Sequence, residues 1–104
     1  MIHPLVKKML DGDINAIIEG MMNYSAIFRT AAIVGAVNNN IDLEPIKGLL
    51  QKLQDDHFAI FGYEIAELAT AALIKLSGES YAGDNYTVRM LVDTPIWFQA
   101  QRLI

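Results

Sequence analysis

The sequence predicts an all-α fold in which two helical hairpins stack, closed by an N-terminal helix and by C-terminal helices. Apolar residues recur at helical spacing along most of the 104-residue chain. In addition, the phrase IEGMMNYSAIF at residues 18–28 returns, with five extra residues, as IKGLLQKLQDDHFAIF at residues 46–61. We therefore expect one domain over residues 1–104, with repeat units at about 14–40 and 42–78 and a C-terminal cap at about 84–104.

The composition is typical of a folded chain without membrane or disulfide features. Hydrophobic residues make up 53% of the sequence and cysteine is absent, which excludes disulfides and thiolate chemistry. The longest apolar run, residues 31–37, is far shorter than the roughly 20 residues that a membrane helix needs. Lys7 and Lys8 follow the first apolar residues, the reverse of the order in a secretory signal. We expect a cytoplasmic protein that does not bind membranes.

The N-terminal segment predicts two short helices. Pro4 suits a first helical turn and Gly12 a left-handed stop, which together define the first helix. Asp13 can cap the second helix. Its apolar residues form a one-sided stripe: Ile14, Ile17, Ile18, Met21 and Met22. We interpret three methionines at helical spacing as core filler: Met21, Met22 and Met90.

The central segment predicts a buried helix and then an amphipathic one. After a bend at residues 23–25, AIFRTAAIVGAV is apolar on almost every side, so its helix should run through the middle of the fold. Asparagines at 38–40 end it, and Asp42 caps a new helix with Pro45 in its first turn. This helix carries another stripe: Ile46, Leu49, Leu50 and Leu53.

One apolar face predicts the longest helix of the chain, beginning after a turn at Asp55 and Asp56. The face covers about five turns: Phe58, Phe61, Ile65, Leu68, Ala69, Ala72, Leu73 and Leu76. Gly78 ends this helix, and Lys75 lies in its last turn, where a cation meets the negative helix end.

The C-terminal segment begins with a loop at residues 79–85 and continues ambiguously. Residues 86–92 alternate as a strand would, but no partner strand is evident and Asp84 can cap a helix, so we favour a helix. Thr94 and Pro95 then predict the start of a final helix. That helix would carry four residues onto the body: Ile96, Trp97, Ala100 and Leu103. We interpret Trp97 as its docking anchor.

The two units resemble a family of helical repeats. FRTAAIVGAV is similar to the start of the second helix in a HEAT-type repeat, with Arg29 and Ala32 at the usual arginine and alanine positions. ATAALIKLSGE resembles the end of the same helix in short bacterial HEAT-like repeats, through Ala69, Ala72, Leu73, Leu76 and Gly78. The resemblance covers about residues 14–79 and implies an α-solenoid-like stack. Matching the two phrases also gives Phe28 and Phe61 equivalent surroundings; a plain bundle of five or six helices is the alternative.

Charge is distributed unevenly along the chain. Residues 1–52 hold five basic and five acidic side chains, whereas residues 53–104 hold three basic and seven acidic ones, so the whole formal charge of −4 lies in the second half. An acidic field repels phosphate backbones and attracts basic proteins. We therefore expect a basic protein partner and no direct binding to nucleic acid, and we leave the oligomeric state open.

The sequence predicts no catalytic residue, no cofactor site and no metal site. The DDH sequence at 55–57 places its potential ligands on adjacent residues, which do not converge on one ion, so we interpret it as a solvated turn. Glu64 and Glu67 lack the repeated Glu-x-x-His motif of di-iron bundles and are interpreted as an acidic surface patch. The chain has no Gly-rich phosphate loop after a strand and no nucleophile elbow.

A candidate protein-binding face lies opposite the apolar stripe of the predicted long helix. Its residues recur at spacings of three and four: Ile60, Tyr63, Glu64, Glu67, Ala71 and Ile74. Together with Asp55 and Asp56 in the preceding turn, they would offer apolar anchors and carboxylates to a basic protein surface. The alternative is that the face packs against the C-terminal helices.

These features favour a non-enzymatic protein-binding domain. Its most concrete version is a bacterial immunity or antitoxin-type inhibitor that covers a basic toxin nuclease with its acidic helical face. A structural scaffold or regulatory subunit of a larger complex is the second hypothesis. An enzyme resembling HEAT-like lyases ranks last, because the chain offers no coherent set of acid, base and binding groups.

Overall fold

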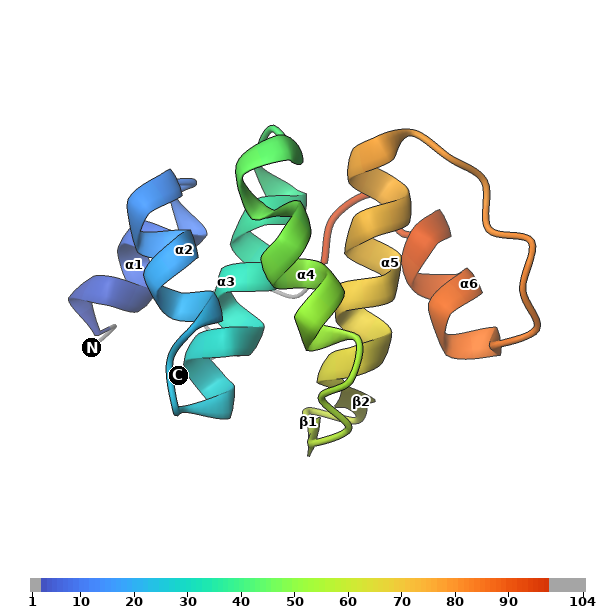
Figure 1. Ribbon diagram of the computed structural model, residues 1–104, viewed down its shortest axis with the longest axis horizontal. Helices are drawn as coiled ribbons and strands as arrows, with labels where there is room; N and C mark the ends of the chain where they lie inside the picture. Colours follow the sequence, from blue (N-terminus) through green and yellow to red (C-terminus); the bar gives the residue numbers. More distant parts are fainter. Residues whose placement is uncertain (1–2, 98–104) are drawn as a thin grey trace.

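The computed structural model describes residues 3–97 and confirms the all-α class (Figure 1). Within these residues there are six α-helices, one 3₁₀ turn and a minimal two-stranded sheet. In chain order the elements are α1 (Pro4–Leu10), α2 (Ile14–Met21), α3 (Ala26–Asn38), η1 (Glu44–Ile46), α4 (Lys47–Leu53), β1 (Ala59–Ile60), β2 (Tyr63–Glu64), α5 (Ile65–Ser77) and α6 (Tyr86–Asp93).

The helices follow one another in chain order along the long axis of the molecule (Figure 1). Each helix packs on its sequence neighbour within the pairs α2–α3, α4–α5 and α5–α6. The first two pairs touch each other through α3 against α5 and through α2 against α4. Helix α1 covers the outer side of α2 and α3, so the core lies between α1 at one end and α6 at the other.

The predicted cap of α2 is confirmed, whereas the cap of α6 is one residue later than predicted. Asp13 Oδ1 accepts a hydrogen bond from the Ala16 N–H at 3.1 Å, which satisfies one free donor at the start of α2. Asn85, rather than the neighbouring Asp84, caps α6 by accepting from the Val88 N–H at 3.0 Å. The segment at 86–92 is therefore helical, as favoured from the sequence.

Helix α3 forms the centre of the core. Its residues from Thr30 to Val37 are all buried, which confirms the prediction that this apolar segment runs through the middle of the fold. Gly35 lets α1 approach, because a Cβ at that position would collide with the Met9 carbonyl oxygen. The crossing of α1 and α3 thus depends on a backbone-to-backbone contact that leaves no room for a side chain.

The second amphipathic helix begins one turn later than predicted. Asp42 accepts from the Glu44 N–H at 3.2 Å, but the first turn, containing Pro45, is the 3₁₀ turn η1 and α4 starts only at Lys47. The predicted stripe packs inward as expected: Ile46, Leu50 and Leu53 are buried, and Leu49 is half-buried.

The predicted long helix is wrong at its N-terminal end. Helix α5 begins at Ile65, and the preceding residues form a hairpin in which Ala59 pairs with Glu64 and Ile60 with Tyr63. Phe61 and Gly62, with φ of 55° and 86°, make a left-handed two-residue turn. Such a turn matches the twist of paired strands, which is why the chain reverses here instead of continuing as a helix.

The predicted equivalence of Phe28 and Phe61 is also wrong. Phe28 lies half-buried in the first turn of α3, with its ring centroid 4.9 Å from that of His3. Phe61 lies at the exposed tip of the hairpin. Two of the three methionines interpreted as core filler, Met22 and Met90, are exposed as well, and only Met21 is buried.

The chain after α6 returns to the core through Trp97. Its indole N–H donates to the Leu91 carbonyl at 2.9 Å, and its backbone exchanges two hydrogen bonds with the Asn38 side chain, at 2.7 and 2.8 Å. Trp97 is buried, as its interpretation as an anchor requires, although residues 95–97 are not helical. The rest of the predicted final helix, with Ala100 and Leu103, lies outside the described residues.

Lys75 in the last turn of α5 reaches the following helix. Its ammonium group donates to the carbonyls of Val92 and Thr94 at 3.0 and 2.9 Å and so satisfies free acceptors at the end of α6.

Among residues 3–97, no helix has both the length and the apolar character needed to cross a membrane.

Alanine at Gly35 should destabilise the protein, because the new methyl group forces α1 away from α3. We expect the free energy of unfolding to fall by about 1–3 kcal/mol, measured by urea denaturation with circular dichroism. The matched control is Gly48→Ala in α4, where a Cβ meets no atom within 4 Å. That change should raise stability by about 0.5–1 kcal/mol, and an equal loss at both positions would contradict the close-contact argument.

Candidate functional site

An open groove lies at the N-terminal end of α5, where the turn after α4 and the beginning of α6 converge. Its volume is about 360 Å³. It is lined by Gln54, His57, Glu64, Ala66, Glu67, Thr70, Tyr81, Asn85 and Val88. Within the described part of the chain, no Lys or Arg lines this groove, so its permanent charges are the carboxylates of Glu64 and Glu67. We call it the carboxylate groove.

The two carboxylates of the groove are held in a capping box. The Glu64 side chain accepts from the N–H of Glu67, and Glu67 Oε1 accepts from the N–H of Glu64 at 3.1 Å. Both negative charges therefore lie at the N-terminus of α5, where free N–H groups and the helix dipole favour them. The predicted acidic pair is real, but it also starts a helix.

Neighbouring polar side chains tie this pair to the elements around it. His57 Nδ1 lies 2.7 Å from Glu64 Oε1, and Asn85 Nδ2 donates to Glu67 Oε2 at 3.2 Å. The Tyr81 hydroxyl accepts from the Asn85 N–H at 3.1 Å. The groove is thus a hydrogen-bonded junction between three segments, and its carboxylates are preorganised rather than free to rotate.

The residues predicted to form one helical face are divided among several places. Ile60 and Tyr63 lie on the hairpin, half-buried against the core, and Asp55 is exposed in the preceding turn. Ala71 is buried. Ile74 lines a separate depression of about 200 Å³ beside α4, together with Leu43, Lys47, Gln51, Gln54, Leu73, Ser77 and Glu79. The structure therefore brings Glu64 and Glu67 together and places Ile74 apart from them.

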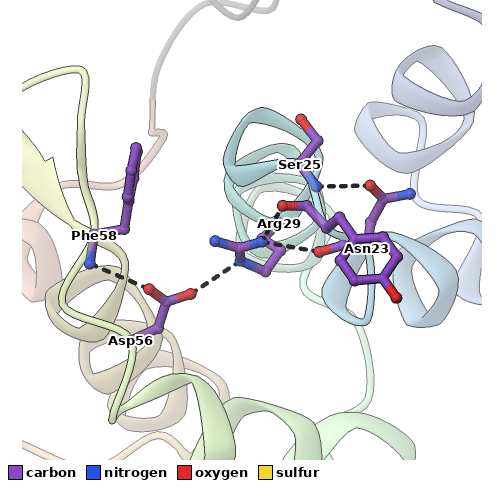
Figure 2. Close-up of polar contacts among 6 residues, drawn as sticks. Asn23, Ser25, Arg29, Asp56 and Phe58 are labelled. Carbon is purple, nitrogen blue, oxygen red and sulfur yellow. Dashed lines mark hydrogen bonds and ion pairs between the residues drawn. The ribbon is translucent and has the colours of Figure 1, made fainter.

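Asp56 is not a free acidic contact, because Arg29 neutralises it. Figure 2 shows the guanidinium group of Arg29 reaching from α3 to the Asp56 carboxylate, with a distance of 2.9 Å between Nε and Oδ2. The same guanidinium donates to the carbonyls of Asn23 and Tyr24 at 2.9 and 2.7 Å. The other Asp56 oxygen accepts from the Phe58 N–H at 3.1 Å, so one ion pair joins the α2–α3 connection to the hairpin.

Sequence reasoning missed an apolar surface on the two segments that Arg29 joins. Tyr24 is fully exposed, and Phe58 and Phe61 are 57% and 46% exposed. We call the aromatic edge the following five exposed side chains: Met22, Tyr24, Ile27, Phe58 and Phe61. The beginning of α3 and the hairpin both lie on the lower side of the molecule in Figure 1. In the sequence, Gly62 directly after Phe61 was the feature that could have indicated a turn with an exposed Phe61 ring.

The described residues contain no group of three or more His, Asp or Glu side chains that could hold a metal ion. Comparison of the chain with protein-family models, curated proteins and solved structures gives no match.

Replacing Arg29 with alanine should destabilise the fold, since it leaves Asp56 Oδ2 and two backbone carbonyls without the guanidinium donor. The paired side chains are only 18% and 22% exposed, so we expect a loss of about 1.5–3 kcal/mol in urea denaturation. In the control, Lys7→Ala breaks the Lys7–Asp11 pair, whose side chains are 67% and 62% exposed. That loss should stay below about 0.5 kcal/mol, and similar losses in both variants would refute the structural role of Arg29.

Proposed function

We propose that this protein is a non-enzymatic binding domain whose carboxylate groove receives a basic protein surface. One observation carries the proposal: a concave, hydrogen-bonded site holds two fixed carboxylates and is lined, within residues 3–97, by no Lys or Arg. The groove also offers polar groups at Gln54, Thr70 and Tyr81 that can bond a partner's side chains.

Electrostatics favours this partner chemistry over nucleic acid. The second half of the chain carries the whole formal charge of −4, and the groove concentrates part of it in a concave surface. A field of this sign raises the association rate of basic proteins and repels phosphates. Lysine or arginine side chains entering the groove would find carboxylates already oriented, so little entropy is lost in ordering them.

The most concrete form of the proposal is a cytoplasmic inhibitor of the immunity or antitoxin type. A nuclease that grips a phosphate backbone must present basic side chains, and an acidic groove complements the same surface. In this proposal the pairs α2–α3 and α4–α5 act as two HEAT-like repeats, with α1 and the C-terminal segment as caps. The contact between α3 and α5 supports that assignment.

A second candidate is a scaffold or regulatory subunit of a larger complex, which the aromatic edge favours. Several large apolar side chains are exposed among the described residues, and exposed apolar surface is typical of a region that another protein covers. The two candidates differ in salt dependence, because contact through an apolar surface is screened far less than contact through carboxylates.

The test of the groove removes its charge without removing its hydrogen-bond acceptors. The double variant Glu64→Gln/Glu67→Gln keeps amide oxygens that can accept from the N–H groups at the start of α5. Affinity capture from the native host, followed by calorimetric titration of the captured partner, should show binding at least about tenfold weaker than for the unchanged protein. Raising the salt concentration from about 0.05 M to about 0.5 M should weaken the unchanged protein similarly.

The control variant, Glu19→Gln/Glu44→Gln, changes net charge equally at two exposed positions outside the groove. It should bind as the unchanged protein does. Equal binding by the groove variant and the control, or capture of an acidic partner only, would refute the groove as the binding site. Thermal unfolding of both variants verifies that the comparison is made between folded proteins.

A further inference from the structure

We propose that His57 is a pH-sensitive switch of the carboxylate groove, whose protonation at mildly acidic pH lowers the affinity of the groove for a basic protein. The inference rests on the proposed function, because it concerns the regulation of the same site. It goes beyond that function by making the strength of binding depend on one proton.

The position of His57 is the first reason. Its side chain lines the groove, and its Nδ1 atom lies 2.7 Å from Glu64 Oε1. The two side chains are 71% and 43% exposed, so that both solvent protons and a partner's side chains can reach them. A neutral imidazole can donate a hydrogen bond to the carboxylate and leave its charge in place, whereas an imidazolium forms an ion pair with it. Protonation therefore offsets one of the two negative charges in the groove.

The groups around His57 are the second reason, because they do not change charge in the same pH range. The titratable and charged groups near it are Glu64 and Glu67 at the start of α5, Tyr81 in the loop before α6, and Asp55 and Asp56 in its own turn, with Arg29 bound to Asp56. The other lining residues, from the ends of α4 and α6 and from α5, are uncharged. Carboxyl groups ordinarily titrate below about pH 5 and tyrosine near about pH 10, whereas histidine titrates between them.

The hydrogen bonds of Glu64 explain how one proton affects binding. The Glu64 side chain also accepts from the N–H of Glu67 in the capping box. When His57 is protonated, this carboxylate lies between a cation and the positive end of the α5 dipole, and a partner's lysine must compete with both. By linkage, binding of a basic protein at about pH 6 displaces protons from the groove.

The experiment measures binding of a fluorescein-labelled octalysine peptide to the full chain by fluorescence anisotropy at low salt. The affinity should fall about threefold or more from about pH 7.5 to about pH 5.5, because one of two groove charges is offset. His57→Gln can still donate to Glu64 but cannot be protonated, so its affinity should be equal at both pH values. His57→Lys carries its charge throughout and should bind weakly at both.

The control uses the other histidine of the chain, His3, which caps α1 by accepting from the Leu5 N–H at 3.1 Å. Asparagine can replace it as a cap, so His3→Asn should keep the full pH dependence. Circular dichroism at both pH values verifies that each variant is folded.

The groove variant Glu64→Gln/Glu67→Gln separates failure of the switch from failure of the groove. If this variant binds the peptide more weakly at about pH 7.5, but the unchanged protein binds equally at both pH values, the switch is refuted and the groove stands. A loss of affinity on acidification that is as large in His57→Gln as in the unchanged protein has the same meaning. Undiminished binding by the groove variant would refute the groove and the switch together.

Discussion

The burial of α3 on every side is the constraint that determines how the other elements are arranged. Because Thr30 to Val37 are all buried, α1, α2 and α5 must each cover a part of this helix. The closest cover is α1, whose backbone at Met9 meets Gly35 with no space for a side chain. Asn38, at the end of α3, then holds Trp97 through two hydrogen bonds. Segments far apart in sequence are therefore fixed to one central helix.

The helices could be predicted because their evidence is local. Apolar spacing and capping residues such as Asp13 mark a helix wherever it occurs. The hairpin could not be predicted in the same way, because AIF occurs at both 26–28 and 59–61. The first copy is helical, whereas in the second Ala59 and Ile60 form β1 and Phe61 begins the turn. What differs is the following residue: Arg29 continues a helix, whereas Gly62 completes a left-handed turn. Phe58 and Phe61 also fit the spacing of the next helix, which hid the break.

The candidate site was predictable only in its charge. The spacing of Glu64 and Glu67 indicated adjacent carboxylates, but their capping role requires α5 to begin at Ile65, which follows from the hairpin. The neutralisation of Asp56 depends on Arg29, 27 residues earlier in the chain, and local patterns carry no information about such a pair. The exposure of Phe61 could not be predicted either, because the hairpin was not recognised. A residue on a helical stripe is expected to be buried, whereas a residue at a hairpin tip is expected to be exposed.

The segment between α4 and α5 contributes Glu64 to the carboxylate groove and packs on the core through Ile60 and Tyr63. The Asp56 carboxylate binds Arg29, and the backbone carbonyl of Asp56 accepts from the N–H of Ala66 at 2.7 Å. The Phe58 carbonyl accepts from the N–H of Ile65 at 3.0 Å. These contacts use backbone groups and one ion pair, so the exposed side chains can change without altering the fold. In the proposed function, partner specificity would then reside in residues 55–67, which carry both carboxylates of the groove.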